Sequence, residues 1–381
     1  MGTLTEWKPA RKGAAKSRGK PVPNTPLLAW YDRHARALPW RIGPAARRQG
    51  ERPEPYNVWL SEIMLQQTRV KAVLPYYREF TSRWPDVRAL AGADEDAVMA
   101  AWAGLGYYSR ARNLIACARQ IRDHFGGRFP GKAGDLAKLP GIGAYTSAAI
   151  AAIAFDEPVA VVDGNVERVI ARYFAINTPL PAAKVEIRAR LAPLVPADRP
   201  GEFAEAMMDL GATICTPRRP ACSLCPLARG CKAFASQGQE QLPVRPAKKR
   251  RPTRYGEAYV AVREDGAVLL RKRPPRGLLG GMAEVPGTVW QELRPGEDAA
   301  PIEGNWKSAA LKVEHTFTHF HLVLGIRQAR FAMTAAAPEG TWWSPPDALA
   351  HEALPSLMKK AIEAVLPGAT RKGAGATRKP E

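Results

Sequence analysis

Apolar residues between positions 26 and 235 recur mainly at helical spacing. Segments 59–73, 94–103 and 144–155 show this spacing. Proline and glycine residues, which interrupt helices, lie in the sequence between them. Beyond residue 256 the period changes. In segments 259–263, 267–272 and 320–326, apolar residues either alternate with polar ones or follow one another, as they do in strands, and segment 355–366 predicts one helix. The sequence therefore predicts a mainly α region followed by a smaller α+β domain.

Changes in composition mark the borders of these regions. Residues 243–256 (PVRPAKKRRPTRYG) combine prolines with like charges, which is typical of an extended linker. The first residues lack apolar periodicity, and the C-terminal residues repeat the motif GATRK. We therefore expect a disordered basic arm (1–22), a helical domain (23–235), a basic Pro-rich linker (236–255), an α+β domain (256–366) and a disordered basic tail (367–381).

The net charge of +20 points to an anionic partner such as nucleic acid. Residues 1–20, 244–254 and 367–381 together hold +14 of this charge, so it supports basic arms more than a basic groove. No apolar window approaches the length of a membrane span, and the N-terminus lacks the apolar core of a secretory signal. We therefore expect a cytoplasmic protein that binds no membrane.

Four of the five cysteines lie close together, with the spacing Cys-x6-Cys-x2-Cys-x5-Cys. They are Cys215, Cys222, Cys225 and Cys231. In a reducing compartment this clustering favours metal ligation over disulfide bonds, and four thiolates can complete a metal centre. Zinc modules usually present two close cysteine pairs and this segment has one, so the spacing alone supports zinc and an iron–sulfur cluster about equally.

A glutamate stands inside the apolar segment WLSEIML at residues 59–65. On a helix, Glu62 shares a face with Trp59, Leu65 and Gln66. Partial burial there is expected to raise the pKa of Glu62 and keep it protonated near neutral pH, as a general acid requires. The alternative is a glutamate that points to water from an amphipathic helix.

Two more motifs stand near the segment 144–155. Leu139-Pro-Gly141-Ile-Gly143 joins helical segments, and its glycines permit a tight turn and close approach of backbone N–H groups to a phosphate. The motif VAVVDGNV at 159–166 begins another helix, where Asp163 or Asn165 either caps the helix or takes part in chemistry. Each motif alone is weak evidence, but their order before a four-cysteine segment favours function.

Together these motifs resemble the helix-hairpin-helix DNA glycosylases of the endonuclease III and MutY superfamily. The resemblance covers nearly all of residues 26–235, and WLSEIMLQQT (59–68), GLGYYSRARNL (104–114) and MMDLGATIC (207–215) are similar to the MutY type in particular. It implies two helical subdomains, a helix-hairpin-helix and one four-iron four-sulfur (4Fe-4S) cluster bound at 215–231. It also implies a monomer that binds double-stranded DNA containing A:8-oxoguanine or A:G mispairs.

The resemblance also assigns roles to residues. The glutamate matching Glu62 protonates adenine, and the aspartate matching Asp163 stabilises the oxocarbenium-like sugar, as in two-carboxylate glycoside hydrolysis. Gln66 and Tyr107 are expected beside the lesion while adenine is flipped out, although Tyr107 and Tyr108 could instead pack in the core. Further substrate candidates are Arg41, Leu65, Asn165 and Glu205. Residues 43–54 form a longer connection than is usual in the family.

One position separates sister enzymes. Members of the superfamily that also cut the strand carry a lysine just after the hairpin, where it forms a Schiff base with the sugar. This chain has Tyr145 there, so we expect base removal with little or no lyase activity. Two alternatives stay open, an endonuclease III-like glycosylase/lyase for damaged pyrimidines and a noncatalytic iron–sulfur DNA-binding protein.

Residues 256–366 resemble the Nudix-like domain with which MutY-type enzymes recognise 8-oxoguanine. The similar sequence segments are VLLRKRPPRGLLGGMAEVPG (268–287) and HTFTHFHL (315–322). Leu279 stands at a position where tryptophan is common in the family. The clustered glutamates that bind magnesium in Nudix hydrolases are missing after Gly287, so hydrolase chemistry is not expected.

The segment 315–321 carries the candidate lesion contacts of this domain. Phe317, Thr318 and His319 occupy the place of the family's Phe-Ser-His recognition loop. The even spacing of three histidines at positions 315, 319 and 321 predicts that they lie on one face of a strand, where the alternatives are surface histidines or a metal site.

Overall fold

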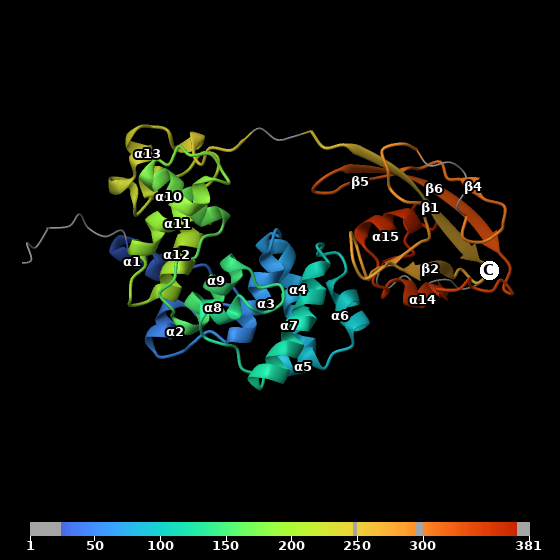
Figure 1. The fold of residues 1–381 in the computed structure, drawn as a ribbon, viewed down its shortest axis with the longest axis horizontal. Helices are drawn as coiled ribbons and strands as arrows, with labels where there is room; N and C mark the ends of the chain where they lie inside the picture. Colours follow the sequence, from blue (N-terminus) through green and yellow to red (C-terminus); the bar gives the residue numbers. More distant parts are fainter. Residues whose placement is uncertain (1–23, 247–249, 295–299, 372–381) are drawn as a thin grey trace, which may run out of the picture. The chain divides into compact units, whose positions relative to one another are not determined.

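A computed structural model describes residues 24–246, 250–294 and 300–371 (Figure 1). The predicted basic arm 1–22 and most of the predicted tail 367–381 lie outside these residues. The described residues divide into two compact units, one of residues 24–36 and 162–244 and the other of residues 37–161 and the described part of 245–371. No helix in the described ranges is long and apolar enough to cross a membrane.

The first unit is helical. It contains α1 (Asn24–His34), α10 (Gly164–Phe174), α11 (Ala183–Leu191), α12 (Pro200–Thr213), α13 (Lys232–Ala235) and the 3-10 turns η1 (Ala192–Leu194), η2 (Cys222–Leu224), η3 (Ala228–Gly230) and η4 (Gln239–Gln241). Proline at the first position starts α12, where a missing N–H costs no helical hydrogen bond. Because α1 and α10 pack against α12, α12 is buried from Pro200 to Gly211 and forms the centre of this unit.

The second unit begins with a helical part. Its helices are α2 (Pro44–Arg48), α3 (Pro55–Leu65), α4 (Val70–Arg83), α5 (Val87–Ala91), α6 (Glu95–Trp102), α7 (Ser109–Phe125), α8 (Ala133–Leu136) and α9 (Ala144–Phe155). The helices predicted over 94–103 and 144–155 are confirmed as α6 and α9. Apolar α9 is buried along most of its length and packs against α3, so the residues at its start lie beside α3.

The single helix predicted over 59–73 is wrong. The structure ends α3 at Leu65 and begins α4 at Val70, and Gln67 between them has a φ of 57°, in the left-handed region. Carbonyls at the end of α3 accept hydrogen bonds from Arg110 on α7. A helix end satisfied by a distant side chain leaves no mark on local apolar spacing, which explains the error.

A seven-stranded sheet follows in the same unit. Its strands are β1 (Thr253–Arg263), β2 (Val268–Lys272), β3 (Ala283–Glu284), β4 (Lys307–Ser308), β5 (Val313–Thr316), β6 (His321–Phe331) and β7 (Thr341–Ser344), and its helices are α14 (Pro346–Leu349) and α15 (Ser356–Glu363). The strand order is β3-β2-β1-β6-β4, with β5 also paired to β6 and β7 to β2. The long strands β1 and β6 run parallel over their whole length (Figure 1), and the other pairs are antiparallel.

The core of this domain lies between the sheet and α15. Alternate residues of β1 and β6 are apolar and buried against the apolar face of α15, which carries Leu357, Met358 and Ile362. The strands predicted near 259, 267 and 320 and the helix predicted at 355–366 are therefore confirmed. The chain thus combines a mainly α region with a C-terminal α+β domain, as its sequence predicts.

Candidate active site and cysteine loop

Glu62 lies on the buried side of α3. Only 5% of its surface is exposed, and its neighbour Trp59 is fully buried. Tyr145, in the first turn of α9, donates a hydrogen bond from its hydroxyl to Oε2 of Glu62 at 2.7 Å. The water-facing alternative for Glu62 is therefore wrong, and the structure brings together two residues that the sequence proposed separately.

The residues expected beside the lesion lie on loops at helix ends. Gln66 follows the last residue of α3, and its Nε2 donates to the Thr146 hydroxyl on α9 at 3.1 Å. Leu65 and Gln66 are half-buried. Tyr107 has a φ of 49° and is 44% exposed, whereas Tyr108 is buried. The core-packing alternative therefore holds for Tyr108 and not for Tyr107.

The predicted hairpin lies between α8 and α9. Gly141 has a φ of 74°, and a Cβ at this position would lie 2.7 Å from Cβ of Asn113, so the turn requires glycine. Gly143 is the N-cap residue of α9, and both glycines are exposed. The start of α9 thus presents exposed backbone at the positive end of a helix, as phosphate contact requires.

Asp163 is the N-cap of α10, so the capping alternative is correct for this residue. Its Oδ1 accepts from the backbone N–H groups of Asn165 (2.9 Å) and Val166 (2.7 Å), and its Oδ2 accepts from the Asn165 amide at 2.8 Å. Burial raises the pKa of Asp163, and these hydrogen bonds and the charge of Arg168 partly oppose the shift. The capped carboxyl is thus fixed in position.

A chain of hydrogen bonds leads from Asp163 to the cysteine loop, residues 215–231. Arg168 donates to the side-chain oxygen of Asn165 at 2.9 Å and to the carbonyl of Cys215 at 2.7 Å. Because Asn165 also holds Asp163, one buried arginine connects the capping carboxyl to the first residue of the loop. Sequence reasoning did not select Arg168, although its i,i+3 spacing from Asn165 on α10 was visible.

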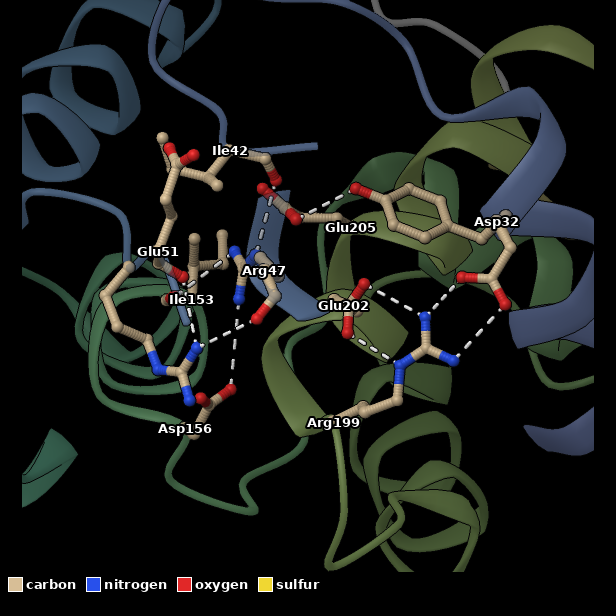
Figure 2. A network of polar contacts seen from close by, with 11 residues as sticks. Asp32, Ile42, Arg47, Glu51, Ile153, Asp156, Arg199, Glu202 and Glu205 are labelled. Atoms are coloured by element: carbon tan, nitrogen blue, oxygen red, sulfur yellow. Dashed lines mark hydrogen bonds and ion pairs between the residues drawn. The ribbon is translucent and has the colours of Figure 1, made fainter. Parts of the chain in front are cut away.

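Glu205 lies inside the first unit, at the centre of α12. Its side chain is 1% exposed, and the hydroxyl of Tyr31 donates to its Oε2 at 2.9 Å (Figure 2). One turn earlier on α12, Glu202 pairs with Arg199, which also binds Asp32 on α1 (Figure 2). The interior of this unit therefore holds two hydrogen-bonded carboxylates of α12, Glu202 with Arg199 and Glu205 with Tyr31.

The long connection at 43–54 is partly helical. It contains α2, and Arg47 on that helix is 7% exposed and contacts the carbonyls of Ile42 and Ile153 at 3.4 Å (Figure 2). An ion pair at 3.9 Å joins Arg47 to Asp156 just after α9. The connection is thus anchored to the end of α9. Arg41, which precedes it, is half-buried.

All four clustered cysteines line one cavity, together with residues of α10, α12 and the cysteine loop. Burial raises the pKa of the Cys225 thiol to about 12 and raises the pKa of the Cys222 and Cys231 thiols. Arg172 contacts the Cys215 sulfur at 3.3 Å and the carbonyls of Thr216 and Pro217. Four thiols around one cavity, with a buried cation, match the donor set of an iron–sulfur cluster.

The cysteine loop and its surroundings contain two further features. Within the described ranges, no three His, Cys, Asp or Glu side chains are arranged to hold a single metal ion. Arg218, Arg219 and Arg229, which stand between the cysteines in sequence, are all exposed. The loop therefore presents cationic side chains outward and sulfur atoms inward.

The candidate recognition residues of the C-terminal domain lie in the turn between β5 and β6. Phe317 is half-buried and packs against the rings of Trp290 (5.7 Å) and Phe320 (4.9 Å), whereas Thr318 and His319 are exposed. The same unit has a pocket lined by Tyr107, Phe317, Thr318 and His319, and the hydroxyls of Tyr107 and Thr318 are 3.2 Å apart.

The prediction that three histidines share one strand face is wrong, because His315 lies on β5, His319 in the turn and His321 on β6. The prediction assumed one continuous strand, in which every second side chain lies on the same face, but a tight turn interrupts the strand here. Leu279 has a φ of 56° and packs against the core of the domain, so this position is filled despite the missing tryptophan.

Comparisons with known proteins agree with these features. Residues 60–196 match the family described as HhH-GPD superfamily base excision DNA repair protein, and residues 258–364 match the NUDIX domain. The chain is 35% identical over 396 residues to an adenine DNA glycosylase of Homo sapiens, and the matched region covers 88% of this chain and 72% of that protein. An adenine DNA glycosylase of Mus musculus is 36% identical over 391 residues, with coverages of 88% and 76%.

Among solved structures, a thermostable thymine-DNA glycosylase matches with 28% sequence identity and a TM-score of 0.49. The match covers 56% of this chain and 95% of that glycosylase. The matched domains and the curated relatives confirm the resemblance that the motifs indicated. By its sequence, its two matched domains and its relatives, the chain belongs to the MutY-type adenine DNA glycosylases, enzymes of base excision repair in the HhH-GPD superfamily.

Proposed function

We propose that this glycosylase acts as a monomer on double-stranded DNA and hydrolyses the N-glycosidic bond of adenine mispaired with 8-oxoguanine or guanine. The observation that carries the proposal is the buried carboxyl of Glu62, held by the hydroxyl of Tyr145 at 2.7 Å. A buried carboxyl in a fixed orientation is suited to deliver a proton to a leaving base.

In the proposed reaction, Glu62 donates its proton to adenine. The bond between the sugar and the base breaks and its electron pair leaves with adenine. Water then adds to the sugar carbon, and the proton that this water loses restores the acid form of Glu62. The carboxylate of Asp163 stabilises the oxocarbenium-like sugar before water adds. Asn165 supports this role, because its amide holds one oxygen of Asp163 at 2.8 Å. Tyr145 supplies no amine, so the strand is not cut by Schiff-base chemistry.

Extrusion of adenine is assigned to the exposed loops. Tyr107 and Gln66, with Leu65 beside it, enter the duplex next to the mispair, while the exposed turn at Gly141 and Gly143 binds a backbone phosphate. The exposure of Tyr107 supports this assignment. Arg41 and Glu205 complete the set of candidate substrate residues, with Glu205 acting from the interior of α12.

Recognition of 8-oxoguanine is assigned to the C-terminal domain. The turn of Phe317, Thr318 and His319 supports it, because Phe317 anchors the turn in an aromatic cluster while the other two side chains are exposed. A hydroxyl and an imidazole at an exposed tip can donate to the oxygen that distinguishes the oxidised base.

We assign one 4Fe-4S cluster to Cys215, Cys222, Cys225 and Cys231. Bound there, the cluster would supply a covalent anchor for the cysteine loop. The exposed arginines of that loop would then be held in place for phosphate contact. No step of base removal passes through the cluster.

The test is single-turnover incubation with duplexes that contain A:8-oxoguanine, A:G or thymine glycol. We expect release of free adenine, with strand breaks only after alkali, and loss of release in Glu62→Gln. Release of thymine glycol with spontaneous nicking would favour the endonuclease III-like alternative. Binding without release of any base would favour the noncatalytic alternative.

A further inference from the structure

Arg110 is a buried cation that the proposed chemistry does not use. It lies in the first turn of α7 and is 6% exposed. A cation near the N-terminus of a helix opposes the helix dipole, so α7 itself gains nothing from this arginine. Burial lowers the pKa of Arg110 to about 10, which leaves the guanidinium charged at neutral pH. Because Arg110 does not stabilise α7, its contacts with other segments of the chain are the ones that explain its burial.

The contacts of Arg110 lie on two separate loops, residues 66–69 and residues 103–108. On one side, Nη1 contacts the carbonyls of Ile63 (3.0 Å), Met64 (2.7 Å) and Gln66 (2.7 Å), which form the end of α3 and the start of the 66–69 loop. Nη2 adds the hydroxyl of Thr68 at 3.2 Å. The guanidinium therefore caps α3 and fixes the loop that follows it.

On its other side, the same guanidinium holds the 103–108 loop. Nη2 contacts the carbonyls of Leu105 (3.1 Å) and Gly106 (3.0 Å). The guanidinium carbon lies 5.5 Å from the centre of the Tyr107 ring and 5.2 Å from that of Trp102, within range of cation–π attraction. Arg110 thus touches the backbone of Gln66 and the ring of Tyr107 directly.

Both loops have backbone conformations that need support. Gln67 and Tyr107 have φ values of 57° and 49°, in the left-handed region that favours glycine. Such conformations cost on the order of 1 kcal/mol or more and persist only where the surroundings hold them. Arg110 supplies hydrogen bonds to the residue before each of them, Gln66 and Gly106. One side chain therefore stabilises both strained turns.

We propose that Arg110 is a positioning residue that fixes the 66–69 and 103–108 loops relative to each other, so that Gln66 and Tyr107 enter the duplex together. The inference rests on the proposed function, because it assumes that these two residues assist extrusion of adenine. A lysine cannot replace the guanidinium, since its ammonium is a single point donor and cannot span both loops.

The test measures base extrusion separately from base removal. Glu62→Gln prevents removal, and 2-aminopurine opposite 8-oxoguanine becomes more fluorescent when it leaves the stack. We expect the rise in fluorescence on binding to fall at least fivefold when Arg110→Lys is added to Glu62→Gln. Binding to undamaged duplex should stay close to that of Glu62→Gln alone, and the melting temperature, although lower, should stay above the temperature of the assay. Arg119→Lys, on the exposed face of the same helix, is the matched control and should leave the rise unchanged.

A milder variant covers the case in which Arg110→Lys does not fold. Thr68→Val keeps the shape of the side chain and removes one acceptor of Arg110, and we expect at least a twofold smaller rise. A full rise with Arg110→Lys, or with Thr68→Val if only that variant folds, would overturn the positioning role. Adenine release by the wild-type protein is measured alongside, so a failure of the proposed function is seen independently.

Discussion

The hydroxyl of Tyr145 lies 2.7 Å from Oε2 of Glu62, and this hydrogen bond joins the start of α9 to the middle of α3. The position of Tyr145 is the one at which a lysine would bring an amine nucleophile. A tyrosine there brings a neutral donor instead, and that donor orients a carboxyl. In the proposed function, this position therefore supplies a neutral hydrogen-bond donor to the carboxyl that protonates adenine.

The Tyr145 hydrogen bond can be tested by its removal. We expect Tyr145→Phe to lower the single-turnover rate of adenine release at least tenfold, since a hydrogen bond to a charged or ionisable partner is worth about 1.5 to 3 kcal/mol. Tyr259→Phe, a buried tyrosine of β1, is the control and should leave the rate unchanged. Equal rates in Tyr145→Phe and wild type would rule out an orienting role.

The raised pKa of Asp163 predicts a pH-dependent stability. Because the folded state holds its proton more firmly than the unfolded chain, this group favours folding at low pH, and that contribution is lost as pH rises from 3.8 through the folded pKa. Asp163→Asn cannot ionise. Its melting temperature, relative to wild type, should therefore increase as pH rises through this window, while adenine release is lost at every pH.

A control of opposite sign is available for that measurement. Arg263 lowers the pKa of exposed Asp265 to about 2, so stability from Asp265 is present above the unfolded pKa and is lost as pH falls towards 2. The relative melting temperature of Asp265→Asn should therefore change in the opposite direction. Parallel slopes for the two variants would contradict the effect of burial on Asp163.

Local signals in the sequence explain which elements could be predicted. Helix α6 is predictable because Asp94 caps it and its apolar spacing is regular, and α9 because glycine precedes a nearly continuous apolar run. The break between α3 and α4 could not be predicted. Its carbonyl acceptors are satisfied by Arg110, more than 40 residues away in sequence, and no local pattern records such a contact.

In the candidate site, too, some features follow from the local sequence and others depend on how the helices pack. The burial of Glu62 follows from the apolar residues around it in the sequence, but its bond to Tyr145 depends on the packing of α9 against α3. For Asp163 the sequence left capping and chemistry as alternatives, and only the packed structure shows the capping contacts. The histidine spacing predicted one strand face over residues 315–321, whereas a turn at Phe317 separates β5 from β6, because spacing along the chain does not show where a strand reverses.

The assignment of the cysteine loop predicts a specific metal content. We expect protein purified without oxygen to contain about four iron atoms per chain and no stoichiometric zinc, with visible absorbance that Cys225→Ser loses. Cys117→Ser, a buried cysteine outside the loop, is the control. One zinc per chain without iron would contradict the assignment.

The Thr318 hydroxyl, which lies in the exposed turn before β6, makes recognition of the oxidised base testable. We expect Thr318→Val, which keeps the branched shape but not the hydroxyl, to reduce the preference for A:8-oxoguanine over A:G about fivefold, since one neutral hydrogen bond is worth about 1 kcal/mol. Thr318→Ser keeps the hydroxyl and should retain the preference. Single-turnover rates on the two mispairs give the ratio for each variant. If valine and serine gave the same ratio as threonine, the hydroxyl would have no part in recognition, and the contact would have to come from His319 or the backbone of the turn.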